Sequence, residues 1–403
     1  MTNLPQGWEV KTLSEIGEIV TGSTPSKSNL DFYGKDYPFF KPSDFEQGYF
    51  LENAGDNLSK LGFGKARQLP PKTILVVCIG SLGKVALTKV IGSCNQQINA
   101  IIPHKNIIPE YIYYYCISSK FQSILFSKAP QTTLAILNKT EFSKLEIIYP
   151  KDIKEQERIV GILDFAFSKI DENIKKAKEN LANIDELMQS ALQKAFNPLN
   201  DNTKENYQLP QSWEWKSLGD TSNYGKTSQV KPSQLKGNDW ILELEDIEKE
   251  SGVLLQKVLF QDRQSKSNKI KFNKGDILFG TLRPYLKKVI IADDNGACSS
   301  EIMPFSTGNS ITNHFIYYYL FANFLHDRIS SLTYGARMPR LGTKDGKSLQ
   351  IPLPPLQEQE QIAEHLDFVF EKAKALKELY TKELKDYEEL KQSLLDKAFK
   401  GEL

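Results

Sequence analysis

The 403-residue sequence is poor in the residues that build thiol and metal chemistry, with only four cysteines and four histidines. No two cysteines stand at CxxC spacing, and no histidine lies near a cysteine or another histidine at ligand spacing, so neither a zinc site nor a disulfide framework is predicted. We expect the cysteines to be small buried hydrophobes in a reducing compartment. These residues are Cys78, Cys94, Cys116 and Cys298, and His104, His314, His326 and His365.

Long apolar runs are also missing. Because no stretch of about 18 apolar residues occurs, no membrane span is predicted. The first residues, MTNLPQGWEV, lack the basic and then apolar profile of a signal peptide. We therefore expect a cytoplasmic protein that does not contact a membrane. An apolar content of 40% and a charged content of 25% are ordinary for a folded chain of two to four domains.

Catalytic signatures are absent as well. The string LGTKDGKS places three residues between Gly342 and Gly346, where a nucleotide-binding loop needs four. No GxSxG or HExxH string occurs, nor does the Asn- or Asp-Pro-Pro-aromatic loop of amino-methyltransferases with its glycine-rich cofactor loop. The sequence therefore predicts a chain without a catalytic site, metal or cofactor of its own.

What the sequence does contain is a long internal repeat. KEQERIVGILD at 154–164 returns as QEQEQIAEHLD at 357–367, and QSALQKAF at 189–196 returns as QSLLDKAF at 392–399, both at an offset of 203. Further pairs follow in the same order, among them LPQGWEVKTL with LPQSWEWKSL and YIYYYC with FIYYYL. The chain is therefore two copies of one plan.

The two strictly repeated segments are predicted to be long helices. Apolar residues recur at steps of three and four along each, which is a heptad seam, and each helix should be roughly 64 Å long. So narrow a stripe needs a partner, which favours pairing of the two copies; the alternative is that each helix packs only on its own block. The predicted seams are Ile159, Leu163, Ala166, Ile170, Ile174, Ala177, Leu181, Ile184, Met188, Ala191 and Ala195, and Ile362, Leu366, Val369, Ala373, Leu376, Tyr380, Leu384, Tyr387, Leu390 or Lys391, Leu394 and Ala398.

The remaining sequence forms two mixed α/β blocks, called block 1 and block 2 below. Short β-rich runs predict strands, and a tyrosine-rich helix is predicted at 110–127 and at 313–331. The predicted strands are 74–79, 99–103, 145–150, 276–280, 288–293 and 348–353. The predicted domains are block 1 at 1–150, a central helix at 151–197, a linker at 198–208, block 2 at 209–353 and a C-terminal helix at 354–403. The predicted fold class is α+β, with two pseudo-repeated blocks separated by two long antiparallel coiled-coil helices.

Several strings resemble the specificity subunits of type I restriction–modification systems. The resemblance covers essentially the whole chain and occurs twice. The strings are VTGSTPSKSNLDFYGKDYPFFKPSDF at 20–45, GSLGKVALTKVIGSCNQQINAII at 80–102, LNKTEFSKLEIIYPKDIKEQERIVGILD at 137–164, LGTKDGKSLQIPLPPLQEQEQIAEHLD at 341–367 and LLDKAFKGEL at 394–403.

This resemblance implies a non-catalytic subunit whose two recognition domains each read one half of a split sequence in double-stranded DNA. It implies an antiparallel helix pair that sets the unread spacer and binds two modification subunits, which carry S-adenosylmethionine and methylate adenine. Restriction subunits that hydrolyse ATP and cut DNA would join them. The two blocks differ widely in their loops, so an asymmetric target is expected.

The repeated Glu-Gln-Glu string has two readings. It could dock the modification subunits with pseudo-twofold symmetry, or its acidic residues could stabilise the helix start through the helix dipole. The docking candidates are Glu155, Gln156, Glu157, Glu358, Gln359 and Glu360.

DNA recognition needs Lys and Arg for phosphates and amide or guanidinium groups for base edges. Block 1 and block 2 are both mildly basic, although the whole chain has a net charge of only +1. The two tyrosine triplets at 113–115 and 317–319 are interpreted as buried helix residues rather than base-stacking groups. The DNA-contact candidates are Ser26, Lys27, Lys65, Arg67, Lys84, Gln131, Thr132, Thr133, Lys226, Lys231, Arg263, Lys266, Arg283, Tyr285, Arg337 and Arg340.

Two other functions stay open at this point. One is a DNA-independent scaffold in which a coiled coil holds two ligand-binding modules. The other is a stand-alone methyltransferase, which the missing cofactor and Pro-Pro-aromatic loops disfavour.

Overall fold

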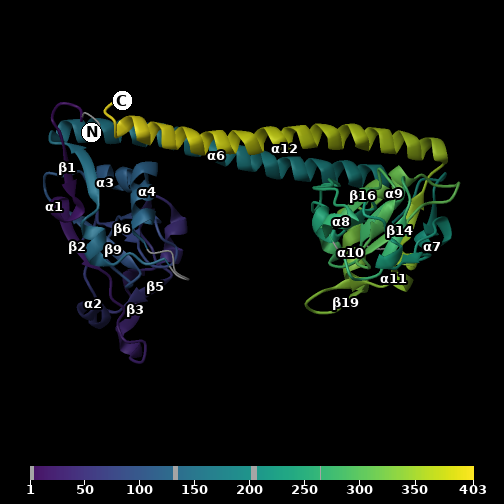
Figure 1. Cartoon of the computed structure of the whole chain (residues 1–403), viewed down its shortest axis with the longest axis horizontal. Helices are drawn as coiled ribbons and strands as arrows, with labels where there is room; N and C mark the ends of the chain where they lie inside the picture. Colours follow the sequence, from purple (N-terminus) through teal and green to yellow (C-terminus); the bar gives the residue numbers. More distant parts are fainter. Residues whose placement is uncertain (1–3, 130–134, 201–206, 264) are drawn as a thin grey trace. The chain divides into compact units, whose positions relative to one another are not determined.

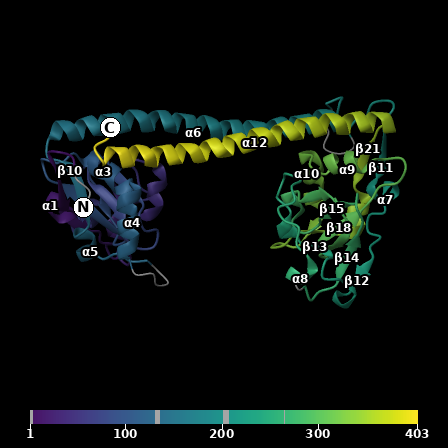
Figure 2. The same cartoon turned by 45° about the horizontal axis from the view of Figure 1, so that its top comes forward.

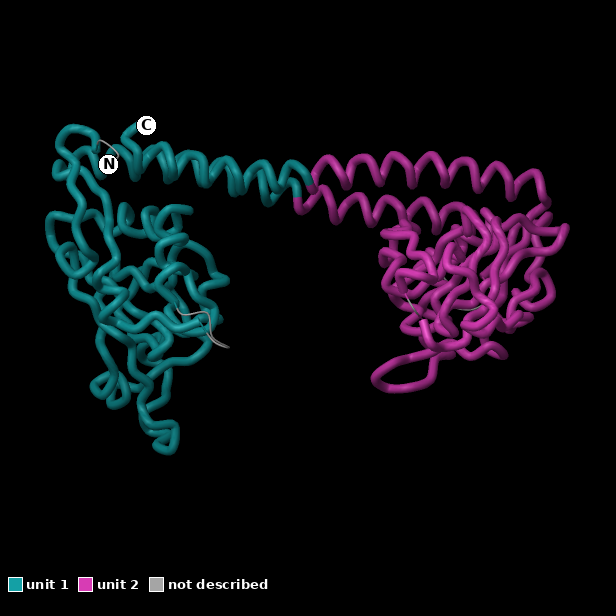
Figure 3. Tube along the Cα trace, in the orientation of Figure 1, with its two compact units in different colours: residues 1–177, 382–403 teal, residues 178–381 magenta. Residues whose placement is uncertain are grey.

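The computed structural model describes residues 4–129, 135–200, 207–263 and 265–403. The chain divides into two compact units, shown in different colours in Figure 3. Unit 1 comprises Met1–Ala177 with Lys382–Leu403, and unit 2 comprises Lys178–Thr381. Each unit therefore holds one block together with a stretch of both long helices.

Unit 1 is built around a five-stranded mixed sheet with the strand order β2-β9-β6-β7-β4. Strand β6 is the sequence ILVV, and all four of its residues are buried, which explains why it is an unbroken apolar run. The sheet strands are β2 (Gly17–Thr21), β9 (Ile98–Pro103), β6 (Ile74–Val77), β7 (Val85–Thr88) and β4 (Phe50–Leu51). The other elements are β1 (Trp8–Thr12), β10 (Glu146–Pro150), β3 (Tyr33–Phe40), β5 (Asp56–Leu58), β8 (Ser93–Cys94), α1 (Leu13–Ile16), α2 (Lys60–Lys65), α3 (Pro109–Ile117), α4 (Ser119–Lys128), α5 (Lys139–Ser143), η1 (Leu30–Phe32) and η2 (Pro42–Gln47).

Unit 2 repeats this plan with shorter strands, in a four-stranded sheet β12-β14-β17-β13 and a three-stranded sheet β16-β15-β18. Its sheet strands are β12 (Gln229–Val230), β14 (Lys269–Phe272), β17 (Gly296–Cys298), β13 (Trp240–Leu242), β16 (Val289–Ile291), β15 (Ile277–Gly280) and β18 (Ile302–Phe305). The other elements are β11 (Glu214–Ser217), β21 (Gln350–Leu353), β19 (Thr333–Tyr334), β20 (Arg340–Leu341), α7 (Leu218–Thr221), α8 (Phe260–Arg263), α9 (Asn313–Tyr319), α10 (Asn323–Leu332), α11 (Thr343–Ser348), η3 (Pro232–Gln234), η4 (Leu244–Asp246) and η5 (Pro284–Leu286).

The first strand of each block pairs antiparallel with the strand that leads into a long helix. In unit 1 this pair is β1 with β10, and in unit 2 it is β11 with β21. The repeated Trp-Glu strings therefore start both blocks at the same structural position. All six strands predicted from β-rich runs are present, with ends that differ by up to two residues.

Each tyrosine-rich stretch forms two helices rather than the predicted one. In unit 1 the break lies at Ser118, whose side chain accepts a hydrogen bond from the Phe121 N–H and caps α4. In unit 2 the break lies between α9 and α10. Neither break carries a proline or glycine, so the sequence has no helix-breaking residue that would have revealed it.

The two long helices are α6 (Ile153–Phe196) and α12 (Leu356–Ala398), of 44 and 43 residues (Figures 1 and 2). Neither contains a proline, and α6 has a single glycine, so nothing interrupts the helical hydrogen bonds. At about 1.5 Å per residue they are roughly 65 Å long. This confirms the predicted α+β class with its two long helices.

Within each unit the two helices pack antiparallel. In unit 2, Ile184 and Met188 of α6 share a cluster with Ala373 of α12. In unit 1, the Lys391 Nζ lies 2.6 Å from an Asp171 carboxylate oxygen. In the same two units, Leu192 shares a core with Leu366, and Leu163 shares a core with Leu395. Within each unit the residue numbers therefore rise along one helix as they fall along the other, which is the antiparallel order.

The predicted seam of α6 is mostly buried, but that of α12 is not. Leu376, a predicted seam residue, remains 41% exposed. Of the alternatives Leu390 and Lys391, Leu390 is 46% exposed and the Lys391 side chain only 17%. At the end of α6, Leu192 and Phe196 are fully buried, while the predicted Ala195 is only partly buried. At the end of α6 this difference has a physical reason, since Leu192 and Phe196 pack in the core of unit 2 and not only on α12.

Among the described residues, no helix is long and apolar enough to cross a bilayer. No group of three or more potential ligand side chains in the described part of the chain could hold a metal ion.

Candidate nucleic-acid interface and helix contacts

The glutamine of each repeated Glu-Gln-Glu string is a buried structural residue. Gln156 accepts a hydrogen bond from the Ile108 N–H (2.9 Å) and donates to the Pro150 carbonyl (2.9 Å). Gln359 accepts from the Thr312 N–H (3.0 Å) and donates to the carbonyls of Ser310 (3.0 Å) and Pro354 (2.8 Å). Both side chains are fully buried. Each glutamine thus binds the start of its long helix to the loop before the tyrosine-rich helices.

The aspartate that ends each repeated string makes a second equivalent contact. Asp164 accepts a hydrogen bond from the Tyr114 hydroxyl (2.6 Å), and Asp367 accepts one from the Tyr318 hydroxyl. Burial and these hydrogen bonds raise the pKa of both tyrosines far above the usual range, so the hydroxyls stay protonated and donate. Two tyrosines of each triplet are buried, which confirms their interpretation as core residues. They are Tyr114 and Tyr115, and Tyr318 and Tyr319.

The second repeated string, at the C-terminal end of each helix, holds the helix that starts after the break. In unit 2, Gln189 of α6 accepts from the Asn323 N–H (3.1 Å) and donates to the Phe321 carbonyl (3.2 Å). In unit 1, Gln392 of α12 accepts from the Ser119 N–H (3.0 Å). These backbone groups are free to bond because the tyrosine-rich helix is interrupted there.

A phenylalanine completes the contact in each unit. Phe399 packs edge-on against Tyr111 and Tyr115 in the core of unit 1. Phe196 packs in the same way against Phe315 and Tyr319 in unit 2. Block 1 is therefore covered by the end of α12 and block 2 by the end of α6, so a helix does not pack only on the block that precedes it.

These contacts correct one part of the docking prediction. Gln156 and Gln359 are buried and cannot reach a partner in the folded chain. Glu155 forms a two-bond ion pair with Arg158, with N–O distances of 2.7 and 2.8 Å. All four glutamates of the two strings, namely Glu155, Glu157, Glu358 and Glu360, remain at least partly exposed.

Most DNA-contact candidates of block 1 lie on its surface. Lys27, Lys65 and Arg67 are exposed, as is Ser26, whose hydroxyl is hydrogen-bonded to that of Ser28. The Lys84 ammonium pairs with the Glu46 carboxylate, which is itself exposed. The stretch Gln131-Thr132-Thr133 lies outside the described residues.

In block 2 the candidates fall into two groups. Lys226, Lys231 and Lys266 are exposed on loops around β12 and before β14. Arg283, Tyr285, Arg337 and Arg340 come together in space, because the Arg283 N–H donates to the Pro339 carbonyl (2.7 Å). The structure thus joins two candidate loops that are more than 50 residues apart in the sequence.

The structure corrects the prediction that Arg263 contacts DNA. Its guanidinium binds both carboxylate oxygens of Asp246, at 2.7 and 2.8 Å, and its side chain is only 13% exposed while that of Asp246 is fully buried. A guanidinium held this way neutralises a buried charge and is not available to a phosphate. The same region buries Lys269 against Glu243 (2.7 Å), so this part of block 2 is an internal ion-pair cluster.

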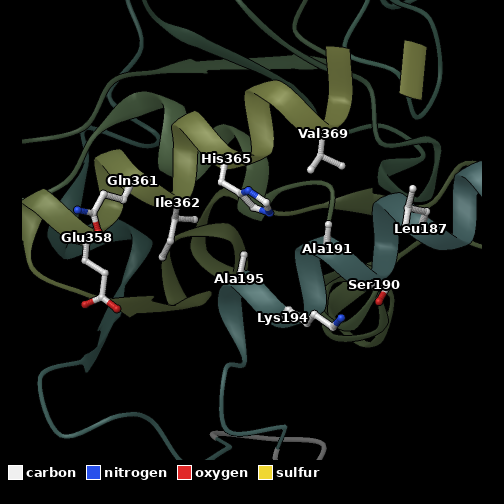
Figure 4. Close-up of a pocket in the computed structure, with 10 residues that line it drawn as sticks. All are labelled: Leu187, Ser190, Ala191, Lys194, Ala195, Glu358, Gln361, Ile362, His365 and Val369. Carbon is white, nitrogen blue, oxygen red and sulfur yellow. The ribbon is translucent and has the colours of Figure 1, made fainter. Parts of the chain in front are cut away.

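A cavity of about 530 Å³ lies between the end of α6 and the start of α12 in unit 2 (Figure 4). Leu187, Ala191 and Lys194 line it from α6, and Glu358 and His365 line it from α12. Its walls mix apolar and charged groups, and no pair of them forms an acid–base or nucleophile arrangement.

The four cysteines are buried and unpaired, as expected from their spacing. Burial raises the pKa of the Cys78 and Cys94 thiols to about 12, which leaves both protonated and unreactive near neutral pH.

Sequence reasoning missed that large apolar side chains on the long helices stay exposed, among them four that form two repeat-related pairs. Phe165 and Leu390 are 70% and 46% exposed in unit 1, and Phe368 and Leu187 are 59% and 58% exposed in unit 2. Phe165 and Phe368 are related by the repeat offset of 203, as are Leu187 and Leu390. Each unit therefore presents an equivalent phenylalanine and leucine to solvent, called the helix patch below. Ile153 in unit 1 and Leu356, Leu376 and Leu379 in unit 2 are exposed on the same helices as well.

Comparison with known families identifies the repeat. The profile described as "Type I restriction modification DNA specificity domain" matches residues 5–183 and again residues 210–385. The chain belongs to this family. The two matches include both blocks and most of both long helices, so the family's domain occurs here twice.

Curated relatives support the assignment. The chain is 39% identical over 176 residues to the type I restriction enzyme HindI specificity subunit of Haemophilus influenzae, covering 42% of this chain and 38% of that one. It is 29% identical over 226 residues to the MjaIX specificity subunit of Methanocaldococcus jannaschii, covering 54% and 52%. Those matches thus span about half or less of these two relatives. The EcoDI specificity subunit of Escherichia coli matches at 23% identity over 99% of this chain and 89% of its own length.

Two solved structures show the same fold. One, described as "Structural basis underlying complex assembly and conformational transition of the type I R-M system", has a TM-score of 0.79 at 19% identity and covers 100% of both chains. The other, the HsdS subunit from Thermoanaerobacter tengcongensis, has a TM-score of 0.55 at 20% identity over 99% of this chain and 98% of that one.

Proposed function

We propose that this chain is the DNA-specificity subunit of a type I restriction–modification complex, in which each block reads one half of a bipartite target in double-stranded DNA. The observation that carries the proposal is the duplicated specificity domain. Each copy is bound to both long helices through the same set of contacts, made by Gln156 and Gln392 in unit 1 and by Gln359 and Gln189 in unit 2.

The two half-sites differ in sequence. Block 1 and block 2 share their scaffold contacts but not their exposed loops: block 1 presents Lys27, Lys65 and Arg67, whereas block 2 presents Arg283 and Arg337 beside Tyr285. Since base edges are read by the side chains on such loops, an asymmetric target follows.

The helix patches are the docking sites for two modification subunits. One phenylalanine and one leucine are exposed at equivalent positions in each unit, and large apolar side chains on a long polar helix favour burial against a partner. Two equivalent patches on one chain fit two identical partners. Glu157 and Glu360, which are exposed and equivalent, would lie at the polar rim of these interfaces.

The chain itself acts without a catalytic group or cofactor. The modification subunits supply S-adenosylmethionine and transfer its methyl group to adenine, and restriction subunits supply ATP hydrolysis and cleavage. The complex acts on DNA in the cytoplasm.

Modified-base sequencing of DNA from a host that expresses this chain with its modification subunit tests the proposal. The expected result is two short methylated motifs at one fixed separation. A host that expresses the modification subunit alone is the control and should show neither motif. An assembled complex that produces no methylation dependent on this chain would overturn the proposal and favour a DNA-independent scaffold.

A further inference from the structure

The hairpin formed by β19 and β20 projects from the body of unit 2, on the side away from α12 (Figures 1 and 3). Its residues Tyr334 and Met338 are 59% and 58% exposed. Large apolar side chains at the tip of a narrow projection contribute little to the stability of the fold, because they bury little surface against it.

The base of this hairpin is held firmly. The Arg283 N–H donates to the Pro339 carbonyl (2.7 Å), and the Leu341 N–H donates to the Thr281 carbonyl (3.0 Å). Gly335 has a φ of +95°, and an added Cβ would lie 3.1 Å from the Met338 carbonyl oxygen, so the tight turn at the tip needs a glycine. The tip is therefore a defined projection.

The hairpin and the loop against which it is bound carry one sign of charge. Residues 281–288 and 333–341 contain Arg283, Arg337 and Arg340 with two lysines, and no carboxylate. Arg283 has a φ of +49°, a left-handed conformation that costs a non-glycine residue on the order of 1 kcal/mol. In block 1 the corresponding position is Gly80, with a φ of +82°. Retaining a bulky cation where the other copy has glycine indicates a role for that cation outside the fold.

We propose that this hairpin enters a groove of the second half-site and that Met338 contacts the bases as an apolar wedge that unstacks a base step. Arg337 and Arg283 bind the flanking phosphates. The inference rests on the proposed function and deepens it, since it names the groups that recognise the half-site of block 2.

Two physical points favour DNA over another occupant. Three arginines in two segments that contain no carboxylate of their own attract a polyanion. Apolar side chains such as methionine, inserted between base steps by proteins with flanking basic groups, kink the duplex and make the deformability of the sequence part of the recognition. Tyr334, on the strand before the tip, adds a flat aromatic surface for a base that Met338 has unstacked.

The test uses the complex of the full chain with its modification subunits, and duplexes carrying 2-aminopurine at successive positions of the block 2 half-site. The fluorescence of 2-aminopurine rises when its base is unstacked. Met338→Ala should abolish this rise and weaken half-site binding about tenfold with an unchanged salt dependence, whereas Met338→Leu should keep the rise. Arg337→Ala should keep the rise but reduce the slope of log affinity against log salt by about one.

Leu255→Ala is the matched control, because Leu255 is 57% exposed in the same unit but lies outside the hairpin. It should change neither fluorescence nor affinity, and thermal unfolding should be equal for all variants. Wild-type fluorescence and affinity in Met338→Ala would overturn the inference. Loss of the modification subunit from Met338→Ala, with DNA affinity intact, would also overturn it and assign the hairpin to a protein contact. Absence of specific binding by the wild-type complex would instead overturn the proposed function.

Discussion

Replacement of Gln359 by alanine tests whether the repeated Glu-Gln-Glu string serves the fold or a partner. The change removes one acceptor and two donor interactions from a fully buried side chain. A buried backbone group left without its partner costs about 1–3 kcal/mol. Three backbone groups lose their partner, and water that enters the space left by the side chain can bind some of them. We therefore expect a loss of about 3–6 kcal/mol in the free energy of unfolding of unit 2.

Gln357→Ala is the matched control, since Gln357 is exposed on the same helix two residues earlier. It should change the stability by less than about 0.5 kcal/mol. Gln359→Glu should be destabilising in a pH-dependent way, because a buried carboxyl has a raised pKa in the folded state. Its stability is then highest below the ordinary glutamate pKa of about 4.3 and falls as the pH rises.

The assay is denaturant unfolding of the isolated chain, followed by hydrogen exchange that reports on block 2 separately from block 1. Local exchange at residues 310–312 and at the start of α12 should rise in Gln359→Ala. The structural role would be refuted by an alanine variant as stable as the wild type that nevertheless fails to bind the modification subunit. That outcome would instead favour a role of the Glu-Gln-Glu string in docking the modification subunit.

Arg263→Ala should lower the stability of unit 2 by about 3–5 kcal/mol in denaturant unfolding, because it leaves the buried Asp246 charge unpaired. Burial lowers the pKa of His326 to about 4, so unit 2 should lose roughly 3 kcal/mol as the pH falls from 6.5 towards 4, and His326→Gln should flatten this dependence in pH-resolved thermal unfolding. Phe165→Glu and Phe368→Glu should each reduce the number of bound modification subunits from two to one in native mass spectrometry, and the double variant should bind none. Four residues inserted in register in both long helices add about 6 Å and should shift the methylated spacer by one or two base pairs at about 3.4 Å each; an unchanged spacer would refute a ruler role for the helices.

The local periodicities in the sequence predicted the architecture well. The repeat offset of 203 located two equivalent long helices, because a heptad stripe without proline has only one stable outcome over 40 residues. Runs such as ILVV at 74–77 became central strands because they are apolar on both faces. Both patterns depend only on residues that are close together in the sequence, so they can be read from the sequence alone.

Roles that depend on distant contacts could not be predicted in the same way. Arg263 and Arg337 have the same charge and both stand in polar segments, but only Arg263 meets a buried carboxylate, which comes from a position 17 residues away. The break in each tyrosine-rich helix was hidden because its partners, Gln189 and Gln392, lie more than 130 residues from it.

The order of the residues is therefore enough to predict the duplicated plan, the two long helices, the main strands and the family. Other features depend on long-range packing: Gln156 and Gln359 bind the helix start to the blocks, each block receives the end of a helix, and Phe165 and Phe368 stay exposed. The physical reason is that secondary structure follows from spacing along the chain. Burial and hydrogen-bond satisfaction follow instead from which remote segments meet, and a repeated string looks the same whether it faces the core or a partner.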